Sequence, residues 1–285
     1  MNNDIKYEIV RLPLKELHSF PDHPFKIRDD EAMSETVESI RNYGILVPAI
    51  VRPRDDGGYE IISGHRRKHA CELAGIDTLP AIIRNLDDDA AVIIMVDSNL
   101  QRENILPIER AAAYKMKLDA IKHQGMRSDL TSTQVAPKLS TEQIGDVEGI
   151  SKDTVKRYIR LTELSPELQQ MVDEKKIALT PAVEISYLKP EEQSLLVETI
   201  ESEQATPSLS QAQRMKKLSQ EGKLTDDSML SIMTEQKQPE RNDLTISGEK
   251  LRKYFPRSFT PQKMEETILK LLDAWMKKRQ RDMER

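Results

Sequence analysis

The hydrophobic pattern of the first hundred residues switches between a period of two and a period near 3.6. Residues 8–12 alternate as a half-buried strand does, whereas residues 31–43 place Met33, Val37, Ile40 and Tyr43 on one helical face, with Gly44 at the stop. Further strands are expected at 45–52 and 59–62, joined by an Asp55-Asp56-Gly57-Gly58 hairpin turn, and at 79–83. Further helices are expected at 66–75 and 87–100. Pro48 suits an edge strand or a bulge. The pattern predicts a compact α+β module.

From Pro107 onwards the pattern becomes all-helical. Residues 108–124 predict one helix with Ala112, Met116 and Ile121 roughly on one side, followed by a polar loop at 125–139. Two more helices are expected at 190–203 and 208–221, and the polar stretch 223–242 is predicted to be a linker, above all in its second half.

Within this helical part, residues 141–161 have the spacing of a helix-turn-helix. Gly145 permits a close helix crossing, Gly149 makes the turn and Ser151 caps the second helix. The residues expected to pack the two helices together are Ile144, Ile150, Val155 and Tyr158. Glu148 stands where such motifs bury an apolar residue, and Val147 is the expected substitute.

The last forty residues predict a small strand–helix unit. A strand is expected at 244–246, a turn at Gly248 and a helix that starts at Thr260-Pro261. Met264, Ile268, Leu271 and Trp275 form an apolar seam along that helix. The seam serves either self-association into a homodimer or packing against the same chain.

Composition narrows the class of protein. The chain has 285 residues, 38% hydrophobic and 32% charged, with a net charge of −5, so any contact with nucleic acid must come from a local basic patch. It contains neither an 18-residue apolar run nor a signal-peptide pattern, and its one cysteine, Cys71, fits a reducing compartment. We therefore expect a soluble, cytoplasmic protein without a membrane partner.

Two polar stretches are candidates for binding chemistry. A short apolar strand runs through Gly64 into His65-Arg66-Arg67 at a helix start, where open N–H groups and two guanidinium groups suit a phosphate. About thirty residues later, Ser98-Asn99-Leu100-Gln101-Arg102 places amide and guanidinium groups at the end of another helix. The alternative is an ordinary solvated basic surface.

The second helix of the helix-turn-helix motif carries the local basic patch. Its exposed face is predicted to hold four positive residues and one negative one: Lys152, Lys156, Arg157 and Arg160 with Asp153. With Ser151 and Thr154 at its start, this helix would enter the major groove of double-stranded DNA. The alternative is a charged helix face in a bundle.

Taken together, the two polar stretches resemble the nucleotide-contacting motifs of the ParB/RepB partition-protein family, Gly-Glu-Arg-Arg and Glu-Asn-(Leu/Ile)-Gln-Arg. The resemblance covers roughly residues 7–190. It implies a ParB/sulfiredoxin-like α+β domain over 1–106, a helical DNA-binding domain over 107–222, a linker over 223–242 and a dimerisation unit over 243–285. It also implies a centromere-like DNA site, a ParA-type ATPase partner, and CTP with Mg²⁺ as cofactors.

The same resemblance assigns roles to residues. Gly64, Arg66, Arg67 and Arg102 would hold phosphates, Asn99 would sit by the metal, and Arg28 would close over the triphosphate. His65, Ser98 and Gln101 complete the nucleotide-binding set by their places in the motifs.

Three departures from the family's motifs concern hydrolysis of the nucleotide. Lys26, His65 and Ser98 stand where the family has a glutamine and two glutamates, so ligands for Mg²⁺ and groups that position water are missing. We expect a nucleotide-binding switch with weak or no hydrolysis. A sulfiredoxin-like enzyme would need a cysteine where Gly64 stands, and Cys71 is more than a helical turn away. A transcriptional regulator on the same scaffold remains the alternative function.

Overall fold

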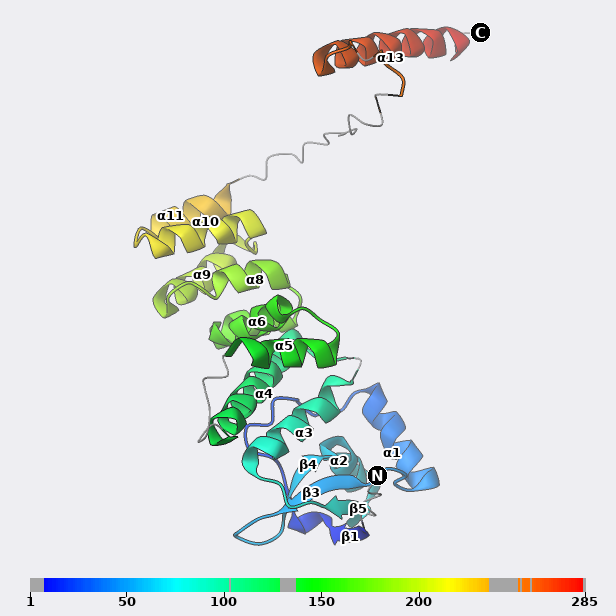
Figure 1. Ribbon diagram of the computed structural model, residues 1–285, viewed down its shortest axis with the longest axis vertical. Helices are drawn as coiled ribbons and strands as arrows, with labels where there is room; N and C mark the ends of the chain where they lie inside the picture. The colour runs from blue at the N-terminus through cyan, green and yellow to red at the C-terminus, as the bar shows by residue number, and fades with distance from the viewer. Residues whose placement is uncertain are drawn as a thin grey trace. The chain divides into compact units, whose positions relative to one another are not determined.

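The computed structural model describes residues 8–102, 104–128, 137–235, 251, 253–256 and 258–283. These residues fall into two units, 1–235 and 236–285 (Figure 1). The first unit contains the predicted α+β module and the helices that follow it.

A five-stranded mixed sheet forms the centre of the α+β module, in the order β1-β5-β3-β4-β2. β3 and β4 form the predicted antiparallel hairpin, β1 is antiparallel to β5, and the β3–β5 and β4–β2 pairs are parallel. Its strands are β1 (Ile9–Pro13), β2 (Leu17–His18), β3 (Ala49–Pro53), β4 (Tyr59–Ser63) and β5 (Thr78–Ile83).

Pro48 lies immediately before β3, which is the central strand of the sheet. The edge-strand alternative for this segment is therefore wrong. The strand itself starts at Ala49, four residues after the predicted start at residue 45. The β3–β4 register shifts between Ile50 and Val51, so the irregularity of this strand lies beyond Pro48 and not at it. A proline directly before a strand removes no ladder hydrogen bond, so the central position tolerates it.

Three helices accompany the sheet: α1 (Glu31–Tyr43), α2 (His65–Ala74) and α3 (Asp88–Leu100). The Asp30 carboxylate caps α1 by accepting from the Met33 N–H, and Met33, Val37 and Ile40 are buried as predicted. Tyr43 is 74% exposed, so its place on the buried face was wrong. Cys71 lies fully buried in the core of the module, as a small apolar residue would.

Helix α4 (Pro107–Ser128) extends four residues beyond the predicted end at Gln124. Its most buried apolar residues are Ala111, Ala113, Tyr114 and Ala120, whereas the predicted set Ala112, Met116 and Ile121 is only partly buried. Together with α5 (Pro137–Glu148), α4 also takes up both ends of the predicted 125–139 loop. Residues 129–136 lie outside the described part.

Helices α5 and α6 (Lys152–Arg160) form the predicted helix-turn-helix. A Cβ built on Gly145 would lie 2.6 Å from the Ile150 carbonyl oxygen, so the close crossing requires glycine there. The Ser151 hydroxyl accepts from the Thr154 N–H at 3.1 Å, which confirms the cap. Val147 is 69% exposed and does not replace the missing apolar residue. The motif is closed instead by Ile144 and Val155, both fully buried in a core shared with Phe20, Phe25 and Ile62 of the module.

The remaining helices of the first unit pack around a third core. Met229, Ile232 and Met233 of α11 are buried in it, so the first half of the predicted 223–242 linker is wrong, and residues 236–242 lie outside the described part. These helices are α7 (Pro166–Asp173), α8 (Leu179–Ile185), α9 (Pro190–Glu203), α10 (Leu209–Gln220) and α11 (Asp226–Thr234).

In the second unit, α13 (Pro261–Met283) starts as predicted. The Thr260 hydroxyl accepts from the Lys263 N–H at 3.4 Å. Met264 is buried, but Leu271 and Trp275 are more than half exposed. The predicted strand at 244–246 and the turn at Gly248 lie outside the described residues. Among the described helices, none combines the length and the hydropathy that a membrane span requires.

Candidate nucleotide cavity and nucleic-acid interface

The first feature of the candidate nucleotide cavity is the turn from β4 into α2. Gly64 has φ of +123°, and a Cβ there would lie 2.8 Å from the Ala49 Cβ, so both conformation and space require glycine. The first hydrogen bond of the helix runs from the Lys68 N–H to the Gly64 carbonyl oxygen. The N–H groups before Lys68 therefore have no acceptor within α2. This turn can therefore receive an anion.

Two cavities of about 410 and 300 Å³ adjoin at this turn and share Arg66 and Arg102 in their walls. They bring together side chains from the 23–30 segment, the start of α2 and the end of α3. All nine predicted nucleotide-binding residues line one cavity or the other: Arg28, Gly64, His65, Arg66, Arg67, Ser98, Asn99, Gln101 and Arg102.

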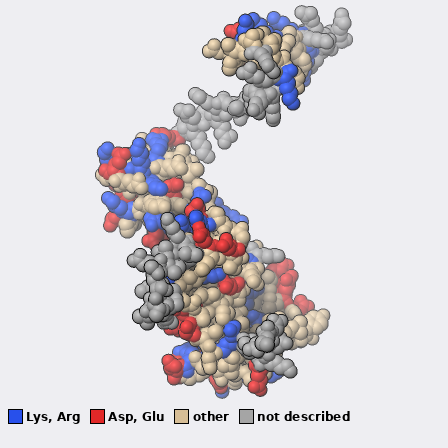
Figure 2. Space-filling model, viewed as in Figure 1, with Lys and Arg blue, Asp and Glu red and all other residues tan. Residues whose placement is uncertain are grey.

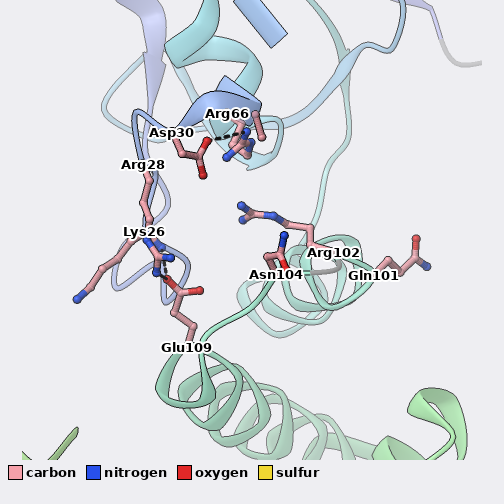
Figure 3. A pocket seen from close by; sticks show the side chains of 9 residues that line it. Lys26, Arg28, Asp30, Arg66, Gln101, Arg102, Asn104 and Glu109 are labelled. Atoms are coloured by element: carbon pink, nitrogen blue, oxygen red, sulfur yellow. Dashed lines mark hydrogen bonds and ion pairs between the residues drawn. The ribbon is translucent and has the colours of Figure 1, made fainter. Parts of the chain in front are cut away.

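The larger cavity is walled by cations and two carboxylates. Arg66 lies 3.8 Å from the Asp30 carboxylate, and Arg28 donates to Glu109 Oε1 at 3.0 Å (Figure 3). Burial, followed by the charge of Arg66, lowers the pKa of Arg102 from its ordinary value. Arg102 remains positive at neutral pH but gains from any anion that enters.

Gln101 and Lys26 face differently from these arginines. The Gln101 side chain points away from the group formed by Arg66 and Arg102 (Figure 3). Lys26 contributes its backbone N–H, which donates to Glu109 Oε1 at 3.2 Å, while its ammonium group points away from Arg66 and Arg102. The ammonium group of Lys26 therefore adds little positive charge to the cavity itself.

Arg67 has a structural role in this structure. Its guanidinium donates to the carbonyl oxygens of Val47 at 2.7 Å and Pro48 at 2.6 Å. Burial lowers its pKa. Of the two adjacent arginines, Arg66 faces the cavity that holds Arg28, and Arg67 anchors the segment before β3.

A histidine pair lines the smaller cavity. His65 accepts from the Phe20 N–H at 3.3 Å, and burial lowers its pKa to about 3, so it is neutral at pH 7. The His23 ring lies 4.0 Å from that of His65 and donates from Nδ1 to the Phe25 carbonyl. His23 Nε2 is buried with no hydrogen-bond partner among the described residues.

Ser98 and Asn99 are positioned by the last turns of α3. The Ser98 hydroxyl and the Asn99 amide both donate to the Met95 carbonyl, at 3.0 and 2.9 Å. The Asn99 carbonyl oxygen is then a neutral, hard ligand, which suits a cation that also binds phosphate oxygens. Within the described part of the chain, no three His, Cys, Asp or Glu side chains gather to hold a metal ion by themselves.

Three titratable residues of this site were missed by sequence reasoning. Asp30 and Glu109 line the larger cavity, and His23 lines the smaller one. Asp30 carries the ordinary signal of a helix cap. Glu109 could be found only by knowing that the start of α4 returns to residues 26–28.

The candidate DNA interface is the exposed face of α6. Lys152 pairs with Glu142 at 2.5 Å and Lys156 with Asp153 at 3.5 Å, and Asp153 and Arg157 are also exposed. On the side of the molecule seen in Figure 2, Lys and Arg are interspersed with Asp and Glu. On α6 itself, Lys152, Lys156 and Arg157 are exposed with Asp153, so the positive charge of this helix is a local feature. Ser151 and Thr154 lie at its start, hydroxyl to hydroxyl at 2.9 Å.

Arg160 does not share that face. Its guanidinium donates to the carbonyl and hydroxyl oxygens of Ser186, at 2.7 and 3.2 Å, and lies 4.2 Å from the Tyr187 ring centroid. The expectation that Arg160 stands exposed with Lys156 and Arg157 was wrong. Its partners lie 26 residues further along the chain, so helical spacing alone could not reveal them.

Comparison with known proteins gives two matches to family models and many to curated relatives. The ParB N-terminal domain model matches residues 2–100, and the ParB HTH domain model matches residues 103–221. The chromosome-partitioning protein Spo0J of Thermus thermophilus is 33% identical over 184 residues, which cover 65% of this chain and 62% of that protein. The nucleoid occlusion protein of Halalkalibacterium halodurans is 35% identical over 196 residues, which cover 68% and 63%.

Solved structures of one relative are also similar. C-terminally truncated ParB of Caulobacter crescentus, complexed to the centromeric parS site, is 26% identical with a TM-score of 0.44, covering 73% of this chain and 98% of that one. The same protein complexed with CTP-γ-S is 28% identical with a TM-score of 0.32, covering 66% and 96%. This chain spans less than two thirds of the length of the curated relatives named above. Because the two domain models together match residues 2–100 and 103–221, this chain belongs to the ParB family.

Proposed function

We propose that this chain is a partition-type DNA-binding protein whose N-terminal module binds a nucleoside triphosphate, with CTP as the expected nucleotide. The observation that carries the proposal is the convergence of all nine predicted residues on two adjoining cavities that share Arg66 and Arg102. The family relationship supports CTP over other nucleotides, since relatives are partition proteins and one of them was solved with a CTP analogue.

The phosphate end of the ligand fits the turn at Gly64. Open N–H groups of α2, with Arg66 and Arg102 beside them, offer charge-assisted hydrogen bonds to phosphate oxygens. Asn99 would contribute its carbonyl oxygen to Mg²⁺ bound between those phosphates. We assign Arg28 to the outer phosphate and Arg67 to the support of the turn, because the carbonyls of Val47 and Pro48 occupy its guanidinium.

Hydrolysis is expected to be weak or absent. A group that orients water for attack on phosphate must accept a proton or a hydrogen bond near the reacting phosphorus. His65 accepts from the Phe20 N–H through Nε2, and the Ser98 hydroxyl donates to the Met95 carbonyl. The side chains at both motif positions are therefore engaged with the protein backbone.

Calorimetry on the full chain tests the nucleotide proposal. CTP, ATP and GTP are titrated with Mg²⁺ into the wild type, Arg66→Ala and Arg54→Ala. Arg54 pairs with Asp56 on the hairpin and is a matched control away from both cavities. Selective binding of CTP that only Arg66→Ala loses supports the proposal, together with phosphate release close to background. Absence of binding of any nucleotide by the wild type overturns it.

DNA binding is assigned to α6, with Ser151, Lys152, Asp153, Thr154, Lys156 and Arg157 as its contacting residues. The support is the exposed position of its charged side chains and the match to the ParB HTH domain model. A centromere-like site, a ParA-type ATPase partner and a cytoplasmic, DNA-associated location follow from the family relationship and belong to the same proposal.

We further propose that α13 makes the protein a homodimer. Leu269, Leu271, Leu272, Trp275 and Met276 are all more than half exposed along this helix. A run of large apolar side chains in water favours association with a second copy. Sedimentation equilibrium of the wild type and of Leu272→Asp tests this. We expect a dimer that the substitution converts to a monomer, and a monomeric wild type at micromolar concentration contradicts the proposal.

A further inference from the structure

Glu109 is the more deeply buried of the two carboxylates in the wall of the larger cavity. Its side chain is 7% exposed, against 50% for Asp30. Oε1 accepts from the Arg28 guanidinium at 3.0 Å and from the Lys26 N–H at 3.2 Å, while Oε2 accepts from the Leu106 N–H at 3.3 Å. One side chain in the first turn of α4 thus fastens the 26–28 segment to the entrance of the helical region.

The charges around the cavity show what this carboxylate does. Arg28, Arg66 and Arg102 face the same space, and within the described residues of its wall the negative charge comes from Asp30 and Glu109. A buried carboxylate is stable only with charged or hydrogen-bonded partners, and Arg28 is its charged partner. A triphosphate brought to these arginines meets the same partners and would compete for them.

We propose that Glu109 is a gating residue of the nucleotide site: its carboxylate holds Arg28 until phosphate oxygens displace it. The inference rests on the proposed nucleotide binding and deepens it. Arg28 exchanges one anionic acceptor for another, and Glu109 is released from the 26–28 segment when phosphate takes its place. The carboxylate therefore lowers the affinity for nucleotide and links occupancy of the cavity to the position of the first turn of α4.

The first turn of α4 is suited to pass on that release. The Ile108 N–H donates to the Asp173 carboxylate of α7 at 3.0 Å, so adjacent residues of one turn bind the N-terminal module and the helical region. A second ion pair, Lys117 with Asp97, holds α4 to α3 and lies outside the cavity wall. A nucleotide would thus loosen the start of α4 and leave its middle attached.

Substitution Glu109→Gln separates the charge from the shape. The amide keeps the size and a carbonyl acceptor for one of the N–H groups, but it no longer attracts Arg28 or repels phosphate. We expect CTP to bind Glu109→Gln about five- to tenfold more tightly than the wild type, the effect of one charge at several ångströms in a partly buried site. A residue with a merely structural role would weaken binding when substituted.

The matched control is Glu163→Gln. Glu163 pairs at 3.3 Å with Lys115 of α4, the helix that carries Glu109, and both side chains are nearly half exposed. This substitution removes a surface ion pair of α4 away from the cavity. Its affinity for CTP is expected to equal that of the wild type, measured by calorimetry on full chains in one buffer.

A second readout needs no nucleotide. Hydrogen exchange of the Lys26 and Leu106 amides is expected to be severalfold faster in Glu109→Gln than in the wild type or Glu163→Gln, because their acceptor is weakened. Unchanged exchange at both amides overturns the gate.

The binding outcomes separate the gate from the proposed function. A wild type that binds CTP together with a variant that binds equally or more weakly overturns the gate alone, since Glu109 then serves the bound state. CTP binding by the variant but not by the wild type overturns the proposed function, because the wild type then has no ligand to gate. No binding of any nucleotide by either chain overturns the proposed function, and the gate with it.

Discussion

The nucleotide cavity and the exposed face of α6 both gather positive charge, but they hold it in different surroundings. In the cavity, Arg66 is 24% exposed beside Asp30, and Arg67 is bonded to two carbonyl oxygens. On α6, Lys152 and Lys156 are about half exposed, and their partners are surface carboxylates. The first set is already desolvated by the fold, whereas the second remains in water.

This difference predicts two kinds of anion binding. A phosphate that enters the cavity exchanges with partners that the protein has placed there, so fixed geometry and glycine at the turn decide its affinity. A DNA backbone on α6 releases counterions from both surfaces, so its affinity depends on salt concentration and on each separate charge. Changes in the cavity should therefore alter folding as well as binding, and changes on the exposed face of α6 should alter binding alone.

The largest expected effect is that of Gly64→Ala. The positive φ of +123° and the approach of a Cβ to within 2.8 Å of the Ala49 Cβ should together lower the free energy of unfolding by about 3 kcal/mol and abolish nucleotide binding. Gly75→Ala is the control, since Gly75 has φ of +74° with open space around it and should cost about 1 kcal/mol. Urea denaturation measures both, and equal losses would show that contact with Ala49 is unimportant.

These glycines also show how far the sequence reaches. The turn at Gly64, the crossing at Gly145 and the stop at Gly44 were all predictable, because each depends on neighbours within a few residues. The same holds for eight of the nine cavity residues, which two local motifs contain, whereas Arg28 comes from the separate 23–28 segment. Local patterns with a family resemblance therefore place the site in the fold.

What escaped prediction depends on partners distant in the sequence. Glu109 meets Lys26 and Arg28 across more than eighty residues, and Arg160 meets Ser186 across 26. Helix α11 falls in the 223–242 segment that was predicted to be a linker. Its Met229, Ile232 and Met233 are buried because α9 and α10 provide a surface for them, whereas Leu230 is 43% exposed. Helical periodicity in the sequence predicts which face of a helix is apolar, but it does not show which residues of another element pack against that face.

The second prediction concerns pH and His65 of the smaller cavity. The pKa of His65 is lowered to about 3 by burial, against 6.5 in an unfolded chain, so the unfolded state binds more protons between these values. Stability is fully present above pH 6.5 and falls as the pH drops towards 3, by about 2 kcal/mol between pH 7 and pH 5. Urea denaturation at a series of pH values measures this loss.

The variant His65→Gln isolates that contribution. It removes the titrating group, so the dependence of stability on pH should become flatter by the amount assigned to His65. Ser194→Ala, at an exposed residue of α9 that carries no titrating group, is the control and should leave the dependence as in the wild type. Parallel pH profiles for all three proteins would mean that His65 is not held neutral by burial.

The third prediction tests the different role of Arg160 on α6. Arg160→Ala removes two hydrogen bonds to Ser186 and the contact with the Tyr187 ring, and should lower the free energy of unfolding by about 1.5 kcal/mol. Arg157→Ala, one turn or less away and exposed, should change it by less than about 0.5 kcal/mol. Thermal denaturation measures the stability of both variants. Equal stability would mean that the Arg160 side chain is exposed like that of Arg157.

The smallest expected effect is that of Lys156→Ala, which is confined to DNA binding. Its side chain is 53% exposed, and its ammonium group pairs only weakly with Asp153 at 3.5 Å, so folding should be unaffected. Loss of one phosphate contact should weaken binding of double-stranded DNA about fivefold at low salt and reduce the slope of log affinity against log salt by about 0.9. Fluorescence anisotropy at several salt concentrations measures the slope, with CTP affinity as the internal control. If Lys156→Ala lowered the CTP affinity and left the slope unchanged, the two sites would not bind anions by the separate mechanisms that their surroundings indicate.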